Sequence, residues 1–264
     1  MRILFIGDVV GKGGRRAVQC LLPRIIDLEC VDLVIANVEN VSGGIGITEE
    51  AILPLKEAGV QVMTSGNHVW RKEGIEDLLG RERNLLRPAN YPRGAPGKGG
   101  VLWKSQLGVS VGIINLVGRV FMDPLDCPFQ TGKELSERFS ENGVKVILID
   151  FHAEATSEKA ALAWYLDGHV SAIVGSHTHV QTADERVLPK GTGFISDMGM
   201  TGAHDSVIGI RIEGSIKRFL SGVPQKLVPA AKNLVLNGVI VDIRDETGKC
   251  LSIRRVTSAL QQSS

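Results

Sequence analysis

The sequence contains a series of short apolar segments typical of buried β-strands, and most of them are followed directly by polar side chains. The segments 3–6, 32–37, 60–64, 144–151 and 170–174 lead into Asp8, into Glu39 and Asn40, into Asn67 and His68, into His152, and into His177 and His179. Segments of helical periodicity separate these strands, which predicts an α/β fold. In open α/β sheets, ligands gather beyond the carboxyl ends of the strands. We therefore expect these side chains to converge.

The remaining pattern predicts the elements around this edge. Helices are expected at 15–28, 48–58, 133–141 and 157–166, and further strands at 101–104, 109–116 and 193–196. An antiparallel hairpin is expected from 234–243 and 249–256, joined by the turn 245–248. We expect one domain over 1–264, in which residues 206–264 complete a second sheet, and fraying at 261–264.

Composition limits the class of protein. The chain has 264 residues, 43% of them hydrophobic, and a net charge of +1, so no bulk nucleic-acid-binding surface is expected. No apolar run approaches the length of a membrane span, and no signal-peptide pattern opens the chain. The four cysteines have no C-x-x-C spacing and are expected to be buried thiols in a reducing compartment. A cytoplasmic protein is expected, and homo-oligomer formation is compatible with the sequence.

The stretch Gly175-Ser176-His177-Thr178-His179 suggests a metal site. In an extended chain, residues i and i+2 point the same way, roughly 6.5 Å apart. Two metals in a hydrolytic pair lie roughly 3.5–4 Å apart, so this spacing predicts one histidine for each metal. Mixed carboxylate, amide and imidazole ligands favour iron, manganese or zinc over calcium.

Each candidate also has an ordinary structural explanation. A His-x-His pair often consists of polar loop residues, Asp8 could cap the following helix, Asn67 could satisfy a turn, and His152 could be a hydrogen-bonded core histidine. Phosphate-loop motifs near Gly11 fail, because GDVVGK is one residue short of a Walker A motif and the glycines break the G-x-G-x-x-G frame. Arg119 and the loop around Arg93 and Lys98 are weaker candidates for holding a phosphate, and His169 and His204 lie outside the strand-end pattern.

The order Gly-Asp, carboxylate-Asn, Gly-Asn-His, a lone His and Gly-x-His-x-His resembles the calcineurin-like metallophosphoesterases. More narrowly, several segments look like the YmdB-type 2′,3′-cyclic-nucleotide phosphodiesterases: GDVVGKGGR, ANVEN, SGNHVW, RPANYP, GRVFMDPLDCPF, DFHAEATSEK, GSHTHVQTAD and SDMGMTG. The likeness is specific as far as Gly209 and weaker in the C-terminal hairpin. It implies a sandwich of packed mixed β-sheets flanked by helices.

The resemblance also implies roles. The superfamily's usual Asp-x-His becomes Asp8 followed by two valines, and its bridging Asp becomes Glu39 beside Asn40. The resemblance implies that Glu39 bridges two divalent or trivalent metals and that His68 is the proton donor. The other ligands divide into Asp8, Asn40 and His179 for one metal and Asn67, His152 and His177 for the other. The implied activity is hydrolysis of 2′,3′-cyclic nucleotides, and of generic phosphodiesters, by a metal-bridged hydroxide.

Two other interpretations remain open at this point. A metal-dependent amidohydrolase also uses His-x-His, but on the first strand of a barrel, whereas here the pair begins at His177. The second is a metal-containing nucleotide-sensing or RNA-regulatory protein with little turnover. The intact His68 and the full ligand set favour catalysis.

Overall fold

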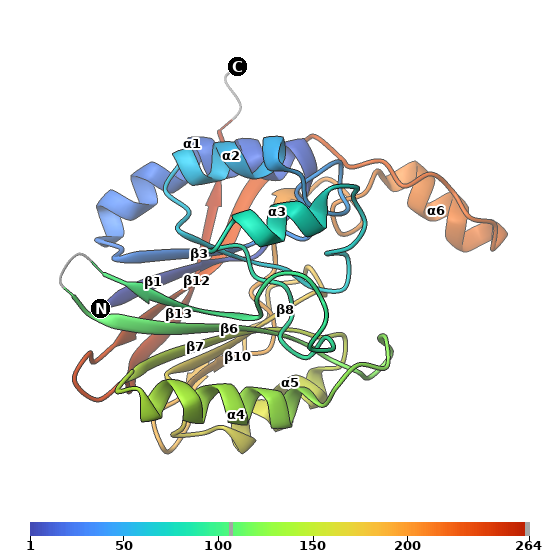
Figure 1. The fold of residues 1–264 in the computed structure, drawn as a ribbon. Coiled ribbons are helices and arrows are strands. Elements are labelled where there is room, and N and C mark those ends of the chain that lie inside the picture. The colour runs from blue at the N-terminus through green and yellow to red at the C-terminus, as the bar shows by residue number, and fades with distance from the viewer. Residues whose placement is uncertain (106–107, 262–264) are drawn as a thin grey trace.

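Two mixed β-sheets pack face to face between layers of helices (Figure 1). The computed structural model describes residues 1–105 and 108–261. The expected α/β sandwich of packed mixed sheets flanked by helices is confirmed. The amidohydrolase interpretation requires a barrel, and it is wrong because the strands form two open sheets. The expected fraying of 262–264 falls outside the described residues.

The first sheet has the order β2-β11-β12-β1-β3-β4, with β13 paired to β12. Its strands are β1 (Arg2–Ile6), β2 (Asp8–Val9), β3 (Leu33–Asn37), β4 (Val62–Thr64), β11 (Met200–Ala203), β12 (Leu234–Ile243) and β13 (Cys250–Ala259). Within it, β1, β3 and β4 run parallel. Their carboxyl ends therefore meet at one edge of the sheet.

The second sheet has the order β5-β6-β7-β8-β10-β9. Its strands are β5 (Gly100–Lys104), β6 (Ser110–Val117), β7 (Val146–His152), β8 (Ala172–Ser176), β9 (Arg186–Val187) and β10 (Gly193–Ile195). The central strands β6, β7, β8 and β10 are parallel. Register pairs His152 at the end of β7 with Ser176 at the end of β8.

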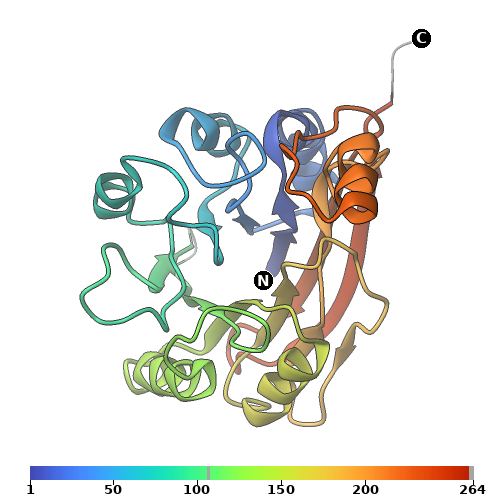
Figure 2. The ribbon, with the colours of Figure 1, turned by 90° about the vertical axis from the view of Figure 1, so that its right-hand side faces the viewer.

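Helices cover the outer faces of both sheets (Figures 1 and 2). The first sheet is covered by α1 (Gly11–Glu29), α2 (Glu49–Glu57) and α3 (Ile75–Arg81), and the second by α4 (Pro128–Glu141) and α5 (Thr156–Tyr165). In contrast, α6 (Ile212–Ser221) projects from the body in Figure 1, and Ser215 is its one buried residue. No helix within the described residues is long and apolar enough to cross a membrane.

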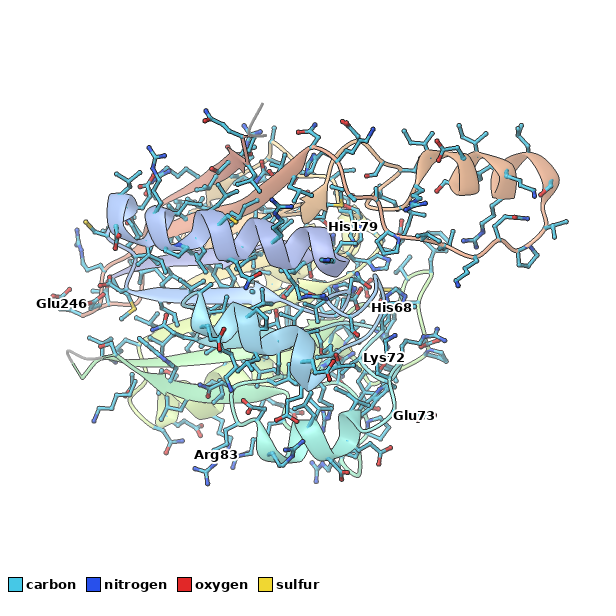
Figure 3. All side chains as sticks on the ribbon, turned by 90° about the horizontal axis from the view of Figure 1, so that it is seen from above. His68, Lys72, Glu73, Arg83, His179 and Glu246 are labelled. Atoms are coloured by element: carbon cyan, nitrogen blue, oxygen red, sulfur yellow. The ribbon has the colours of Figure 1, made fainter. Side chains whose placement is uncertain are left out.

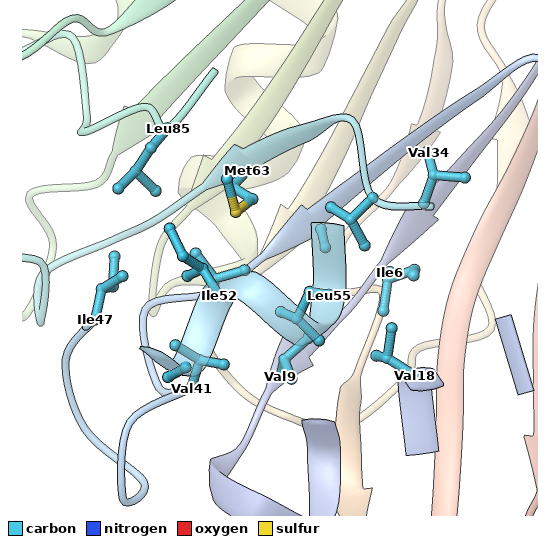
Figure 4. Close-up of a cluster of buried hydrophobic side chains, with 14 of the residues drawn as sticks. Ile6, Val9, Val18, Val34, Val41, Ile47, Ile52, Leu55, Met63 and Leu85 are labelled. Carbon is cyan, nitrogen blue, oxygen red and sulfur yellow. The ribbon is translucent and has the colours of Figure 1, made fainter. Parts of the chain in front are cut away.

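Strand β1 shows how the layers are held together. Side chains alternate along a strand, so Ile3 and Phe5 pack between the two sheets while Leu4 and Ile6 pack under the helices of the first sheet. Figure 4 shows the cluster of apolar side chains under the helices of the first sheet, in which Ile6 lies near Val18 and Leu55. A strand buried on both faces needs a continuous apolar sequence, which β1 has.

The C-terminal hairpin is present, but it joins the sheet of β1 rather than completing a separate one. Strand β12 pairs antiparallel with β1 over Arg2 to Ile6, and β13 covers its other edge. Almost every residue of β12 is buried, so it needs a partner strand on each side. The hairpin pattern identified the strands, but a pairing across more than 230 residues left no local signal.

Several element boundaries also differ from expectation. Helix α1 begins at Gly11, and α4 begins at Pro128, a favourable first helical residue because its missing N–H has no partner there in any helix. Helices α3 and α6 were not predicted. All four cysteines are free, but Cys20 and Cys30 are exposed and only Cys250 is buried, so the expectation of buried thiols is wrong for those two.

Candidate metal centre

The polar side chains at the strand ends come together at the edge where the parallel strands of both sheets finish. Asp8, Glu39, Asn40 and His152 are buried, whereas His68, His177 and His179 are partly exposed. Figure 3 shows His68 and His179 at the same end of the molecule. Sequence positions as distant as Asp8 and His177 are in direct contact there, because the His177 backbone N–H donates to Asp8 Oδ2 at 3.1 Å.

Three ligand-type atoms lie close to the Nε2 atom of His152. His152 Nε2 lies 3.0 Å from His177 Nδ1, 3.1 Å from Asn67 Oδ1 and 3.2 Å from Glu39 Oε2. Two ligands bound at about 2.1 Å to one ion are roughly 3.0–3.4 Å apart at tetrahedral or octahedral angles. Gly66 makes room for this arrangement, since a Cβ there would lie 2.1 Å from the His152 ring. The set therefore has the spacing of ligands around a single metal ion.

A second group adjoins Glu39 through Asn40, whose Nδ2 donates to Glu39 Oε1 at 2.9 Å. Asp8 Oδ1 and His179 Nε2 are 3.9 Å apart, and Asp8 Oδ1 is buried without a hydrogen-bond partner among the described residues. A buried carboxylate oxygen left in this state is costly unless a cation is bound. Asn40, however, turns its Nδ2 toward His179 Nε2 at 3.3 Å, so its amide must turn over before Oδ1 can serve as a ligand here.

In His152, His177 and His179, one ring nitrogen faces the cluster and the second ring nitrogen lies next to a hydrogen-bond acceptor. His152 Nδ1 lies 2.9 Å from Ser176 Oγ, His177 Nε2 lies 3.0 Å from Glu154 Oε2, and His179 Nδ1 lies 2.9 Å from the carbonyl oxygen of Ile208. An acceptor at one nitrogen fixes the proton there and leaves a lone pair on the other. The free lone pairs then belong to the three nitrogens that face the cluster. This is the arrangement of metal-binding histidines.

A buried polar network supports His152 from behind. Ser176 Oγ donates to Asp150 Oδ1 at 2.7 Å, and Asp150 Oδ2 also accepts from Thr64 Oγ1 and, at 3.1 Å, from Asn37 Nδ2. Burial raises the pKa of Asp150 to about 6 in spite of these bonds. Asp150, Ser176 and Glu154 were not predicted as functional residues. Ser176 was visible only as a spacer in the His-x-His motif.

Burial and neighbouring charges shift the pKa values of the clustered side chains, and in the metal-free protein they favour a proton on His152. Burial alone would lower the pKa of His152, but Glu39 and Asp8 raise it to about 9. Burial and the neighbouring His152 lower the pKa of His177 to about 3. Burial would raise the pKa of Glu39, yet the His152 and His68 rings hold it well below its usual range. Asp8 has a raised pKa, chiefly from burial.

The two histidines of the motif do not lie in extended chain as expected. Strand β8 ends at Ser176, and His177 and His179 have φ values of 102° and 65°, in the left-handed region that non-glycine residues seldom adopt. The backbone turn directs the rings to different partners, His177 toward His152 and His179 toward Asn40. Asp197 Oδ2 stabilises the turn by accepting from Thr178 N at 3.0 Å and from the buried Lys159 Nζ at 2.9 Å.

His68 stands at the mouth of the cluster. Its Nδ1 lies 2.9 Å from Asn40 Oδ1 and 3.2 Å from Glu39 Oε1, and its backbone N–H donates to Glu39 Oε2. With Nδ1 occupied, Nε2 is the nitrogen available to a ligand. His68 also lines a cavity of about 410 Å³ together with Asn40, His177 and His179.

The other candidates lie elsewhere. Arg119 is exposed, and its Nη2 lies 3.5 Å from Cys127 Sγ. Arg93 and Lys98 line a separate cavity of about 630 Å³ with apolar side chains from α4. His169 borders a shallow depression near α4, and His204 Nε2 lies 3.4 Å from Asn237 Nδ2. The structure brings none of these side chains to the cluster.

The sequence profile of the YmdB-like proteins matches residues 4–256. The chain is 47% identical to the 2′,3′-cyclic-nucleotide 2′-phosphodiesterase of Bacillus subtilis, over 97% of this chain and 96% of that protein. A crystal structure of a hypothetical protein from Thermus thermophilus has a TM-score of 0.92 and 43% identity, covering 98% of this chain and 99% of that one.

A more distant structure shares the architecture. The calcineurin-like phosphoesterase YfkN from Bacillus subtilis has a TM-score of 0.61 at 14% identity, covering 98% of this chain and 90% of that one, which shows likeness of fold. With nearly the whole chain matched by the family profile and by a relative of 47% identity, this chain belongs to the YmdB-like family, and its fold is that of the calcineurin-like phosphoesterases.

Proposed function

We propose that this chain hydrolyses 2′,3′-cyclic nucleotides, and generic phosphodiesters more broadly, at a site for two metal ions. The observation that carries the proposal is the set of three histidines whose outer nitrogens are anchored while their inner nitrogens face the cluster that contains Asp8 and Glu39. The substrate class comes from the Bacillus subtilis relative, whose name specifies a 2′,3′-cyclic-nucleotide 2′-phosphodiesterase.

The donor atoms fit two neighbouring ions. Asn67, His152 and His177 would hold one, and Asp8 and His179 would hold the other, with Glu39 shared between them. Asn40 would join the second set after its amide turns over. Oxygen and imidazole donors of this kind suit iron or manganese, and zinc as well. When bound, two such ions supply an activated water and positive charge that neutralises the phosphodiester oxygens.

The chain's own contribution to the reaction is the placement of a proton. His68 Nδ1 lies 3.2 Å from Glu39 Oε1, an acceptor that remains when the Asn40 amide turns over, and this leaves Nε2 to donate a proton to the departing ribose oxygen. An alkoxide is a poor leaving group, so a proton donor matters most for cyclic nucleotides and least for aryl diesters. Glu39 restrains the same residue through the His68 backbone N–H, which couples the position of the acid to the metal ligands.

The test combines metal content with substrate choice. Metal-stripped protein is reloaded with manganese or iron and assayed on 2′,3′-cyclic AMP, 3′,5′-cyclic AMP and an aryl phosphodiester. His68→Ala should keep both metals, lose about 10²–10⁴-fold in rate on the cyclic nucleotides, and lose less on the aryl diester. His169→Ala removes a histidine outside the cluster and should behave as wild type.

Two outcomes would contradict the proposal. Equal rates for His68→Ala and wild type on 2′,3′-cyclic AMP would remove His68 as the acid. A fully loaded wild-type protein that binds cyclic nucleotides without turnover would favour the nucleotide-sensing alternative.

The reducing cytoplasm remains the proposed location, supported by the four free cysteines. Homo-oligomer formation remains a prediction.

A further inference from the structure

The lining of the cavity beside the metal ligands is of two chemical kinds. The polar residues are Glu39, Asn40, His68, Glu154 and His177 to His179. The apolar residues, here called the apolar wall, are Val10, Ile45, Ile208, Ile210 and Leu227. Glycines 43 and 44 complete the lining. The described lining contains no lysine or arginine.

Three of the five side chains of the apolar wall are exposed, whereas Val10 is buried. Ile45 is 38% exposed, Ile208 is 53% exposed and Leu227 is 42% exposed. Apolar side chains gathered beside a polar site are typical of ligand pockets, where a few polar groups orient the ligand and apolar groups supply contact area. Between 38% and 53% of each of these three residues is exposed in the free protein and is available to contact a ligand.

The position of Ile208 links this wall to the metal ligands. Its φ of 43° is unfavourable for a β-branched residue, and such strain persists where surrounding contacts impose it. Its carbonyl oxygen accepts from His179 Nδ1 at 2.9 Å, while its side chain lines the cavity. One residue therefore orients a metal ligand and forms part of the apolar wall.

The apolar wall is held in place before any ligand arrives. Residues on both sides of Ile210 pair with the returning chain, since Ala230 N donates to the carbonyl of Gly209 at 2.8 Å and Arg211 N donates to that of Val228 at 2.9 Å. The loop that carries Ile45 packs against the same chain, because a Cβ on Gly44 would lie 2.7 Å from Pro229. The cavity is therefore largely preformed.

We propose that the apolar wall is the subsite for the nucleobase of the substrate, and that it accepts all four bases with little discrimination. The proposal rests on the function proposed above, since the phosphodiester must sit at the polar side of the same cavity. Hydrogen-bond donors and acceptors at fixed positions discriminate between bases, and the side chains of the apolar wall have none. The flat face of a base would cover Ile208 and Leu227, whereas a second phosphate would find no lysine or arginine in this lining.

The test compares substrates with and without a base. Wild-type protein is assayed on the four nucleoside 2′,3′-cyclic phosphates and on methyl riboside 2′,3′-cyclic phosphate, which lacks the base. We expect kcat/KM for all four nucleotides to lie within about tenfold of one another and to exceed that of the base-free compound by about tenfold or more. Calorimetry should likewise show tighter binding of adenosine 3′-monophosphate than of ribose 3-phosphate.

Two substitutions probe the apolar wall directly. Leu227→Ser and Ile45→Ser each remove contact area from side chains that line the cavity and anchor no metal ligand. Each should lower kcat/KM on the nucleotides by about tenfold and change that of the base-free compound by less than about twofold. Leu220→Ser is the matched control, because Leu220 is 84% exposed on α6 and lies outside the cavity.

The outcomes separate this proposal from the function it rests on. Failure of the metal-loaded wild type on every cyclic phosphate, base-free compound included, would refute the proposed function. Turnover with no advantage for a base, a preference above about a hundredfold for one base, or equal losses on both substrate types in Leu227→Ser would overturn the base subsite.

Discussion

Replacing Ser176 by alanine should weaken metal binding although Ser176 is not a ligand. Its Oγ accepts from His152 Nδ1 and donates to Asp150, and it is fully buried. Without it, nothing fixes the lone pair of His152 on Nε2. Loss of such a supporting partner costs about 10–100-fold in metal affinity, or about 1.4–2.8 kcal/mol. Leaving buried polar groups unpaired should also lower the free energy of unfolding by about 1–3 kcal/mol.

Ser171→Ala supplies the control at the other end of β8. Ser171 is equally buried, and its Oγ accepts from Ile147 N at 3.1 Å, but it lies away from the cluster. Both variants should lose similar stability in urea unfolding of the metal-free protein. Only Ser176→Ala should lose affinity when manganese is titrated against a chelator of known strength. Equal affinities for Ser176→Ala and wild type would refute the claim that Ser176 sets the His152 tautomer.

Three further predictions follow from the buried charges. Asp8→Asn should stabilise the metal-free protein, because it removes the charge of a buried carboxylate whose Oδ1 has no hydrogen-bond partner among the described residues, and it should lower metal occupancy; a lower melting temperature of the metal-free variant would contradict this. The pKa of His152, raised from 6.5 to about 9, contributes stability to the metal-free protein that is fully present below pH 6.5 and lost as pH rises through 9. Metal binding displaces that proton, so affinity should increase over the same range, and chelator titrations at several pH values check the sign. Lys159→Met leaves Asp197 as an uncompensated buried charge and should cost about 3–5 kcal/mol in urea unfolding, part of which Asp197→Asn in the same chain restores.

The strand-end pattern predicted the location of the site because it combines local signals with one topological rule. Asp8, Glu39, His152 and His177 each lie at or just after the end of a parallel strand, and such strands finish at a common edge. The sequence therefore determined which side chains converge. It did not determine how the two motif histidines are oriented, because the turn depends on Asp197 from a distant loop.

The residues that position the metal-binding histidines could not be predicted from a sequence pattern. Asp150 lies inside a buried strand, where an apolar residue is usual, and its three partners come from three other strands. Glu154 follows β7 and resembles a surface acid until its distance to His177 is known. The pairing of β12 with β1 depends in the same way on a long-range contact. Side chains that act by positioning other side chains have no characteristic spacing in the sequence.

The most direct test is a titration of metal-free protein with manganese, in which bound metal and the rate on 2′,3′-cyclic AMP are measured in the same samples. A dinuclear phosphodiesterase predicts saturation at two ions per chain, with turnover appearing as the second ion binds. Saturation at one ion per chain, or full turnover at that point, would contradict the assignment of Glu39 as a ligand shared by two metals.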